Sequence, residues 1–217
     1  DKVDPGFIFN FTHNCVTDTR YNEQWAIDDT GIDINACDAW DITTGSSDII
    51  LAIIDDGIDN NHSEFNHTNF TVSYDVYNGT SASLYLDHGT KVCGIISSNH
   101  SESDIAGIAP GLSIMEISHP SYGIDNASEY YAAGFNWAVQ NNADIISNSW
   151  GVPIELYNDL HTIALEDAID NALDNGRNGL GCIVLFASGN YDNLSSPAMH
   201  YPSIYRDEIL TVGSIDY

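Results

Sequence analysis

Residues 48–57 read DIILAIIDDG, and this stretch decides the fold. The run 48–54 is apolar after its first residue and does not alternate with polar residues, which is typical of a strand buried on both faces of a parallel sheet. Asp55 follows directly, so a carboxylate stands at the carboxyl end of the predicted strand. Because ligands of open parallel sheets bind beyond those ends, Asp55 is a candidate functional residue.

Apolar runs alternate with helical patterns after this strand. We expect helices at 89–98, 128–140 and 160–175, and further strands at 71–76, 113–117, 143–147, 182–187 and 209–212. The alternation predicts an α/β fold in which helices cover both faces of a mostly parallel sheet. No internal repeat, linker or low-complexity tract interrupts the pattern. We therefore expect one domain, with a loop-rich N-terminal segment at 1–47 and a core at 48–217.

Net charge limits the partners of the chain. The 217 residues contain 5 Lys+Arg and 32 Asp+Glu, a formal net charge of −27 at pH 7. Such a surface repels phosphate backbones and anionic lipids, so we expect no binding to nucleic acid or to membrane surfaces. No run of 18 apolar residues is present, so we expect no membrane span. The 43% of apolar residues is enough to build a full core in a chain of this length.

Asn-x-Ser/Thr sequons bear on the compartment, because the chain has more of them than its composition predicts by chance. The eight sequons begin at Asn10, Asn61, Asn66, Asn69, Asn78, Asn99, Asn126 and Asn193. The first residues lack the apolar core of a signal peptide, so either the chain is cytosolic or a targeting segment has been removed. The sequons favour removal and a secreted glycoprotein; the alternative is an Asn-rich chain with unused sequons.

Four cysteines are too few for a disulfide scaffold. Cys15 and Cys37 lie in the polar N-terminal stretch and could pair. Cys93 and Cys182 stand among small or apolar neighbours. We expect these two to be buried thiols and not metal ligands, because the chain has no CxxC or HxxxH spacing.

Two further polar residues stand at the same predicted edge of the sheet as Asp55. His88 begins the helix expected near 89–98, and Asn190 follows the strand expected at 182–187. A carboxylate, an imidazole and a carboxamide should therefore converge. A buried carboxylate can fix the tautomer of a histidine that acts as general base. A carboxamide can donate a hydrogen bond to an oxyanion.

Four motifs in this order closely resemble the subtilisin-like serine proteases. They are IIDDG at 53–57, HGTKVCG at 88–94, SNSWG at 147–151 and FASGN at 186–190. Their detailed forms, together with Gln24-Trp25 and the stretch 170–190, look most like the kexin, or proprotein convertase, branch. The similarity runs from about Gln24 to Tyr217, nearly the whole chain. It implies a secreted endopeptidase with a three-layer α/β/α fold, truncated here before the nucleophile helix.

The resemblance implies a role for each matching residue. Asp55 would be the carboxylate of an Asp-His-Ser triad, His88 its general base and Asn190 the oxyanion donor. Ser149-Trp150-Gly151 would pair with the substrate backbone, so the expected substrate is a polypeptide. Taken singly, Asp55 and Asn190 could be turn residues and His88 a helix N-terminal residue. Their joint occurrence in family order favours the catalytic interpretation.

The serine nucleophile of this family is not among these residues. Family members carry it at a Gly-Thr-Ser helix start well beyond the oxyanion Asn, whereas this chain ends at Tyr217, 27 residues after Asn190. The stretch 79–82, GTSA, imitates that motif but precedes His88, so we do not expect Ser81 to be catalytic.

Three explanations for the missing serine stay open. The chain could be the N-terminal part of a longer protease, or one piece of a cleaved enzyme whose serine is on another chain. In either case the remainder of its own chain or another protomer would cover the face left open by the missing helix. The third explanation is a non-catalytic relative, a glycosylated extracellular structural or interaction module, which is the alternative to an enzyme.

The resemblance also implies a structural Ca²⁺, which family members hold with oxygen ligands. Glu64 stands nine residues after Asp55 and matches a carboxylate ligand of the family. The loop 99–105 would supply further oxygens, and a glycan at the Asn99 sequon would have to point away from it. The alternative for this loop is a solvated acidic turn without a cation.

Overall fold

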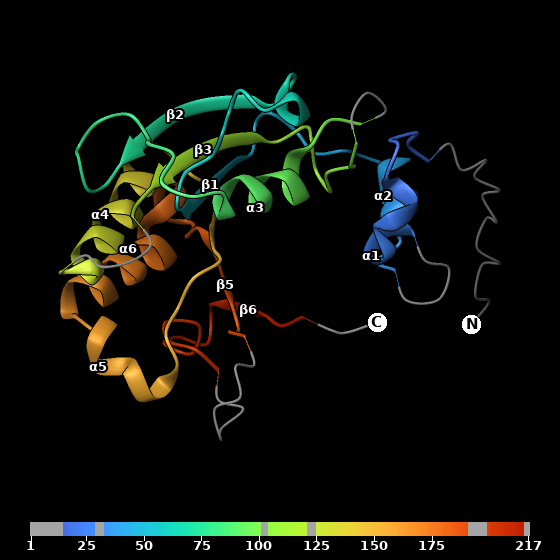
Figure 1. Ribbon diagram of the computed structural model, residues 1–217. Coiled ribbons are helices and arrows are strands. Elements are labelled where there is room, and N and C mark those ends of the chain that lie inside the picture. Colours follow the sequence, from blue (N-terminus) through green and yellow to red (C-terminus); the bar gives the residue numbers. More distant parts are fainter. Residues whose placement is uncertain (1–14, 29–32, 101–103, 121–124, 191–198, 215–217) are drawn as a thin grey trace, which may run out of the picture.

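The computed structural model describes residues 15–28, 33–100, 104–120, 125–190 and 199–214 (Figure 1). Their centre is a six-stranded sheet in the order β2-β3-β1-β4-β5-β6. Every adjacent pair of strands is parallel. The strands are β1 (Ile50–Asp55), β2 (Asn69–Asp75), β3 (Ser113–Ser118), β4 (Ile145–Asn148), β5 (Ile183–Ala187) and β6 (Leu210–Val212).

Helices connect the strands and cover both faces of the sheet. α3 (His88–Ser97) packs on one face, while α4 (Ala127–Gln140) and α6 (Ile163–Gly179) pack together on the other (Figure 1). This is the three-layer α/β/α arrangement expected from the sequence. The shorter helices are η1 (Tyr21–Glu23), α1 (Trp25–Asp28), α2 (Ala36–Trp40), η2 (Ser63–Phe65), η3 (Ile154–Leu156) and α5 (Tyr157–Leu160).

β1 shows why the sheet needs two helical layers. Ala52 and Ile54 are buried among residues of α4 and α6, whereas Leu51 and Ile53 are buried with Cys93 of α3. Successive side chains of a strand point to opposite faces, so both faces of β1 are covered. Double burial accounts for the unbroken apolar run in the sequence.

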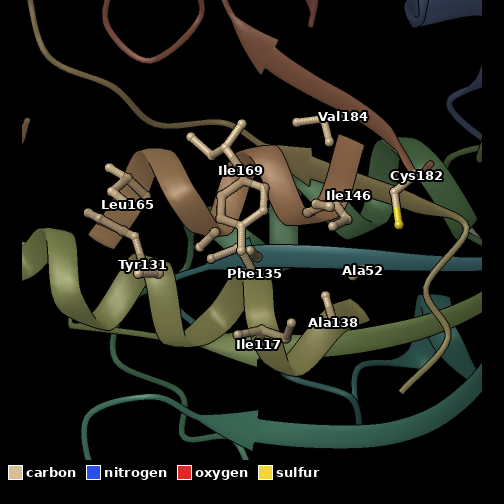
Figure 2. Close-up of a cluster of buried hydrophobic side chains, with 14 of the residues drawn as sticks. Ala52, Ile117, Tyr131, Phe135, Ala138, Ile146, Leu165, Ile169, Cys182 and Val184 are labelled. Atoms are coloured by element: carbon tan, nitrogen blue, oxygen red, sulfur yellow. The ribbon is translucent and has the colours of Figure 1, made fainter. Parts of the chain in front are cut away.

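The larger core lies between the sheet and the pair α4 and α6 (Figure 2). Phe135 of α4, Ile169 of α6 and Val184 of β5 have no exposed surface there. The Phe135 ring stacks on Phe186 of β5 at a centroid distance of 6.1 Å. Close packing of this kind leaves little freedom for the strands, so their carboxyl ends are held in fixed positions.

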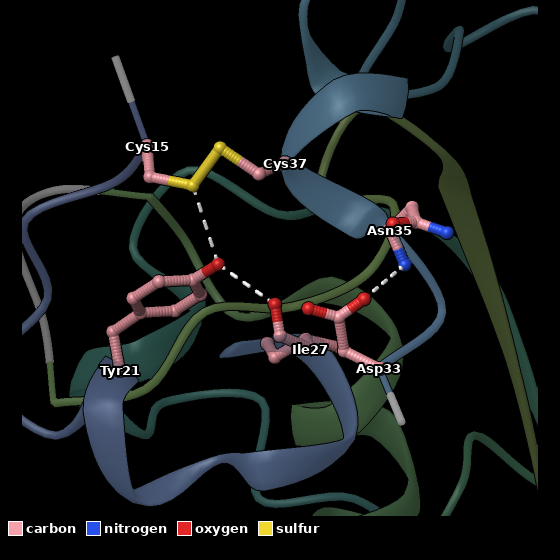
Figure 3. Close-up of a disulfide and its surroundings, with 6 residues drawn as sticks. All are labelled: Cys15, Tyr21, Ile27, Asp33, Asn35 and Cys37. Carbon is pink, nitrogen blue, oxygen red and sulfur yellow. Dashed lines mark hydrogen bonds between the residues drawn. A yellow bond between two sulfur atoms is a disulfide. The ribbon is translucent and has the colours of Figure 1, made fainter. Parts of the chain in front are cut away.

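A disulfide organises the N-terminal segment (Figure 3). Cys15 and Cys37 are bonded, with their Cα atoms 5.4 Å apart. The Tyr21 hydroxyl lies 3.3 Å from Cys15 Sγ and donates to the Ile27 carbonyl oxygen at 2.8 Å. Tyr21 and Ile27 are buried together with Ala106, so this segment packs against the loop that precedes β3.

The boundaries of α6 have identifiable causes. The Thr162 hydroxyl accepts a hydrogen bond from Leu165 N at 3.2 Å and caps the helix, so α6 begins at Ile163 and not at the expected residue 160. At the other end Gly176 is extended, with ψ of 163°. Regular helix therefore ends at Asn175, as the sequence predicts. In the described part of the chain no helix has the length and apolarity needed to cross a bilayer.

Candidate active site

β1 lies where the order of the strands reverses. The chain places β2 and β3 on one side of β1 and then continues with β4, β5 and β6 on the other. Open parallel sheets bind ligands at the carboxyl edge of such a point. Asp55 is the last residue of β1 and pairs in register with Ser118, the last residue of β3. Its carboxylate is therefore placed at this edge.

Asp55 and His88 are joined by a hydrogen bond. Asp55 Oδ1 lies 2.8 Å from His88 Nδ1. Asp55 is only 5% exposed, whereas the His88 side chain is 55% exposed. Burial raises the pKa of the Asp55 carboxyl, and the hydrogen bonds from His88 and from the Asp56 N–H oppose that shift. A buried carboxylate thus orients the ring and leaves much of the imidazole open to solvent.

Asp56 explains why α3 begins at His88. Its Oδ1 accepts a hydrogen bond from Gly89 N at 2.7 Å, and its Oδ2 accepts one from His88 N at 3.3 Å. These are N–H groups that the first turn of a helix leaves without intrahelical partners. One ligand atom each of Asp55, Asp56 and His88 lie within 4.8 Å of one another, as in a metal site. The helix cap and the Asp55–His88 bond are sufficient to explain this grouping.

Two glycines allow α3 to approach the end of β1. A Cβ atom on Gly89 would lie 2.4 Å from the Gly57 carbonyl oxygen and 3.0 Å from Asp55 Cβ. Gly57 itself has φ of +104°, in the region that favours glycine. A side chain at position 89 would push the first turn of α3, and with it His88, away from Asp55.

Trp150 brings the segment Ser149–Gly151 to the same edge. Its indole Nε1 donates to the Ile54 carbonyl oxygen at 3.1 Å, one residue before Asp55. The Trp150 ring also stacks on Tyr131 of α4 at a centroid distance of 3.8 Å. The segment that the resemblance assigns to substrate binding is therefore beside the end of β1.

Asn190 is exposed and stands three residues beyond the end of β5. Because β5 runs parallel to β4 and β4 to β1, Asn190 is on the same edge of the sheet as Asp55. Gly189, with φ of +108°, turns the chain just before it. Among the residues that the structure describes, Asn190 makes no hydrogen bond to Asp55 or His88.

Ser81 stands just after the turn at the end of β2. The turn after β2 is closed by hydrogen bonds from Asp75 N to the Thr80 carbonyl oxygen and from Gly79 N to the Asp75 carbonyl oxygen, both at 2.8 Å. In the described ranges, the Ser81 hydroxyl makes no hydrogen bond to His88. The GTSA stretch is thus a turn that follows an edge strand.

Glu64 anchors the loop that the resemblance connects with calcium. It is buried, its Oε1 accepts from Asp104 N at 2.9 Å, and its carbonyl oxygen accepts from Asn99 N at 3.0 Å. Residues 101–103 of the loop expected at 99–105 lie outside the described part of the chain. Because a carboxylate oxygen that accepts one hydrogen bond keeps a further lone pair, the donor chemistry of Glu64 fits a hard cation such as Ca²⁺.

The sequons differ in accessibility. Asn61, Asn66 and Asn126 are exposed. Asn69 and Asn78 are also exposed, but their Nδ2 atoms donate hydrogen bonds within the protein. Asn99 is only 7% exposed, so a glycan would require its buried carboxamide to turn outward, and glycosylation there disagrees with this structure. Asn10 and Asn193 lie outside the described residues.

The remaining cysteines are buried free thiols, as expected. Burial raises the pKa of Cys93 to about 12 and that of Cys182 to about 11. Neither thiol is therefore activated as a nucleophile.

His119 is a buried polar residue of this edge that sequence reasoning missed. It directly follows β3, is 2% exposed, and has no hydrogen-bond partner for either ring nitrogen in the described part of the chain. Its backbone N–H donates to the Asp55 carbonyl oxygen at 2.9 Å, and its ring packs edge-to-face on Tyr131. Burial lowers its pKa to about 4; the nearby backbone of Pro120 and the carboxylates of Asp56 and Asp75 oppose the shift, whereas His88 adds to it. The signal in the sequence was its place two residues after the strand predicted at 113–117.

The fold, together with the Asp–His pair at β1 where the order of the strands reverses, defines a domain of the subtilisin-like protease class. The family model described as the Subtilase family, Peptidase S8, matches residues 46–217. The chain therefore belongs to the subtilase family.

Several curated relatives are similar over most of the chain. The calcium-dependent protease of Nostoc sp. is 37% identical over 78% of this chain and 28% of its own length. The major intracellular serine protease of Bacillus subtilis is 32% identical over 84% of this chain and 56% of its own length. The dibasic-processing endoprotease of Schizosaccharomyces pombe is 30% identical over 94% of this chain and 30% of its own length. The chain thus spans less than two thirds of each relative.

Solved structures share the fold. The prenylagaramide maturation protease PagA aligns with a TM-score of 0.67 at 24% identity, over 84% of this chain and 59% of that protein. MycP1 without its N-terminal propeptide aligns with a TM-score of 0.66 at 22% identity, over 84% of this chain and 61% of that protein. At these identities the likeness concerns the fold alone.

Replacing His119 by Leu should make stability less sensitive to acid. The folded-state pKa of His119, about 4, lies below the usual 6.5, so its unfolded form binds a proton first as the pH falls. Stability that is complete above pH 6.5 should therefore decline towards pH 4, by about 3 kcal/mol in total. The charged or titratable groups that act on this ring are Asp56, Asp75 and His88.

Urea unfolding at pH 7, 5.5 and 4.5 would measure this effect. The difference in unfolding free energy between the wild type and His119→Leu should shift in favour of the variant as the pH falls. Contributions from Asp55 and Glu116, whose pKa values burial raises, are present in both proteins and cancel in the difference. His67→Gln, at an exposed position, serves as the control. A pH-independent difference would contradict the assignment of a buried neutral ring.

Proposed function

We propose that this chain is part of the catalytic domain of a subtilisin-like serine endopeptidase. The observation that carries the proposal is the 2.8 Å hydrogen bond between Asp55 Oδ1 and His88 Nδ1 at the carboxyl edge of β1, in a chain of the subtilase family. The serine nucleophile would come from the remainder of the protein, which is in keeping with relatives that are longer than this chain.

In this proposal each residue has one task. His88 takes the proton from the serine hydroxyl as that oxygen attacks the peptide carbonyl carbon, and then returns it to the leaving amine. Asp55 keeps the proton of His88 on Nδ1 and stabilises the imidazolium that forms. The Asn190 carboxamide donates to the developing oxyanion. The backbone of Ser149–Gly151 pairs with the substrate strand.

The remainder of the protein would also cover an open face of the sheet. Ile183 of β5 and Leu210 and Val212 of β6 are exposed, although each belongs to a strand of the sheet. Apolar residues gathered in this way on a sheet mark a surface that another element covers. We propose that the segment bearing the serine is that element, with another protomer as the alternative.

Hydrolysis of an internally quenched peptide by the complete protein would test the proposal. Asp55→Asn and His88→Ala should each reduce kcat by about 10³- to 10⁴-fold, because the imidazole loses its orientation or is absent. Asp87→Asn is the matched control: it removes an exposed carboxylate that pairs with Lys91 and leaves the Asp55–His88 bond in place. A fluorophosphonate probe should label the wild type at a serine outside residues 1–217.

Two results would count against the proposal. Labelling at Ser81 would place the nucleophile in the turn after β2. A complete protein without hydrolysis or labelling would favour the glycosylated structural module instead.

We further propose that Ca²⁺ stabilises the loop around Glu64. The buried carboxylate supports this, as do two relatives named calcium-dependent proteases at 37% and 39% identity. Ca²⁺ at 100 times its Kd should add about 2.7 kcal/mol to the unfolding free energy, and EDTA should remove it. Calorimetry with and without EDTA should show a lower Tm for the chelated wild type and no Ca²⁺ response for Glu64→Gln. Glu129→Gln, at an exposed site of α4, should respond as the wild type does.

We also propose that the protein is secreted and glycosylated, which rests on the number of sequons and on the exposure of Asn61, Asn66 and Asn126. Enzymatic removal of N-glycans from protein purified from its native source should lower the intact mass. Peptide mapping should find these three sites occupied and Asn99 bare. An intact mass equal to that of the polypeptide would contradict the proposal.

The branch of the family remains a separate proposal. Kexin-like motif forms and 30% identity to a dibasic-processing endoprotease support the kexin branch, but the cyanobacterial relative is 37% identical. The residue that the enzyme selects before the cleaved bond would distinguish the branches.

A further inference from the structure

β2 forms one outer edge of the sheet, because it pairs with β3 on one side and ends the order of the strands (Figure 1). An edge strand presents unpaired backbone N–H and C=O groups, with which a strand of another molecule can pair. In the described part of the chain, a bridge between Asp75 and Thr80 occupies the outer side at the last residue of β2. Thr71 and Val72, in the middle of the strand, are exposed. This stretch of the edge is therefore accessible.

The edge lacks the side chains that usually keep strands of different molecules apart, which are exposed charges, above all Lys, and Pro. Residues 65–74 contain no Asp, Glu, Lys, Arg or Pro, although the chain has 5 Lys+Arg and 32 Asp+Glu. The flanking charged residues, Glu64 and Asp75, are buried. The register of β2 shifts between Phe70 and Ser73, which disturbs the edge but adds no charge to it. An uncharged stretch with Phe, Thr, Val and Tyr is of the kind that pairs with copies of itself.

Sequons gather along this edge. Asn61 and Asn66 lie in the segment that leads into β2, Asn69 is its first residue, and Asn78 lies in the turn that follows it. Half of the eight sequons thus fall within residues 61–78. The seven residues of the strand span about 20 Å, at about 3.3 Å per residue. Because N-linked glycans are bulky and hydrated, glycans at these sites would flank the open stretch.

Hydrogen bonds distinguish the sites that can carry a glycan without loss. Asn61 and Asn66 are exposed, and no other described residue accepts a hydrogen bond from their side chains. Asn69 Nδ2 donates to Ser113 Oγ at 2.7 Å. A glycan replaces one of the two Nδ2 hydrogens and leaves the other for this bond. Asn78 Nδ2 donates two hydrogen bonds, so a glycan there would remove one of them.

The opposite edge of the sheet differs from β2. There β6 exposes Leu210 and Val212, and we have proposed that the remainder of the protein covers them. Residues 199–217 contain no Asn, so no glycan would obstruct that contact. The edge assigned to a protein contact is thus without sequons, whereas the edge without such a partner has several.

We propose that N-glycans at Asn61, Asn66 and Asn69 cover the outer side of β2 and prevent it from pairing with β2 of a second copy of this chain. The inference rests on the proposed glycosylation and gives it a specific task. Two copies related by a twofold axis would pair their β2 strands antiparallel. Backbone hydrogen bonds would supply the affinity, as in other cases of strand addition to a sheet edge.

Self-association of the complete protein, produced in a host that attaches N-glycans, would test this inference. The variant that combines Asn61→Gln, Asn66→Gln and Asn69→Gln should associate in sedimentation experiments at concentrations at least about tenfold lower than the wild type, the change that about 1.4 kcal/mol of binding free energy produces. Hydrogen exchange should then show new protection at residues 69–75. Asn126→Gly, the control, removes an exposed sequon at the start of α4, where φ is 62°, and should behave as the wild type does.

A charge placed on the strand should replace the glycans. Val72 is 46% exposed, so adding Val72→Lys to the triple variant should restore the monomer, because two copies of the lysine would repel each other across the paired strands. Leu180→Lys, at a 78% exposed position before β5, adds the same charge elsewhere and should leave the association unchanged. Since the net charge is −27, an added lysine reduces the general repulsion between molecules. Restoration of the monomer would therefore come from the strand itself.

The outcomes separate this inference from the proposed glycosylation. A triple variant as monomeric as the glycosylated wild type, or association that Val72→Lys does not reverse, would overturn the inference and leave the glycosylation standing. A wild type with a glycan at Asn126 and none at Asn61, Asn66 or Asn69 would do the same. A wild type without any glycan would overturn both. Circular dichroism of each variant would establish that association comes from a folded protein.

Discussion

The approach of the first turn of α3 to the end of β1 is the constraint on which the rest of the site depends. Gly57 and Gly89 let backbone pass against backbone there, and Asp56 satisfies the helix N–H groups that this contact would otherwise bury unpaired. With the helix start fixed, the hydrogen bond between His88 and Asp55 follows from geometry. The core beneath β1 and α4 keeps the strand end from moving, so a carboxylate can be held where water is largely excluded.

Polar groups are concentrated at this edge at an energetic cost. Asp55 Oδ2 and both nitrogens of His119 are buried there without a hydrogen-bond partner in the described residues. On folding, such groups lose their hydrogen bonds to water and normally replace them with hydrogen bonds inside the protein. Natural domains tolerate this mainly at functional sites, where local rules are broken and the surrounding packing compensates. The apolar layer of α4 and α6 provides that packing here.

The sequence predicted those parts of the fold that depend on local periodicity. The apolar run 48–54 and the alternating pattern after it gave the strands and helices within a few residues, because burial on two faces leaves a clear mark on composition. The order of the motifs predicted that Asp55 and His88 act together, and the structure places them in contact. His119 was missed because its importance comes from a partner distant in the sequence, the ring of Tyr131. Such a contact has no periodic signal.

The ion pairs of Arg206 influence how the stability of the protein depends on ionic strength. Its guanidinium contacts carboxylates of Asp170, Asp174 and Glu208 at 2.8 to 3.1 Å, in a chain where 5 basic residues face 32 acidic ones. At about 0.15 M salt the Debye length is near 8 Å, so dissolved ions weaken the repulsion between distant carboxylates more than contacts at this range. Added salt therefore relieves the forces that push the surface apart while the short ion pairs persist. A domain built in this way is therefore more stable at high salt concentration than at low salt concentration.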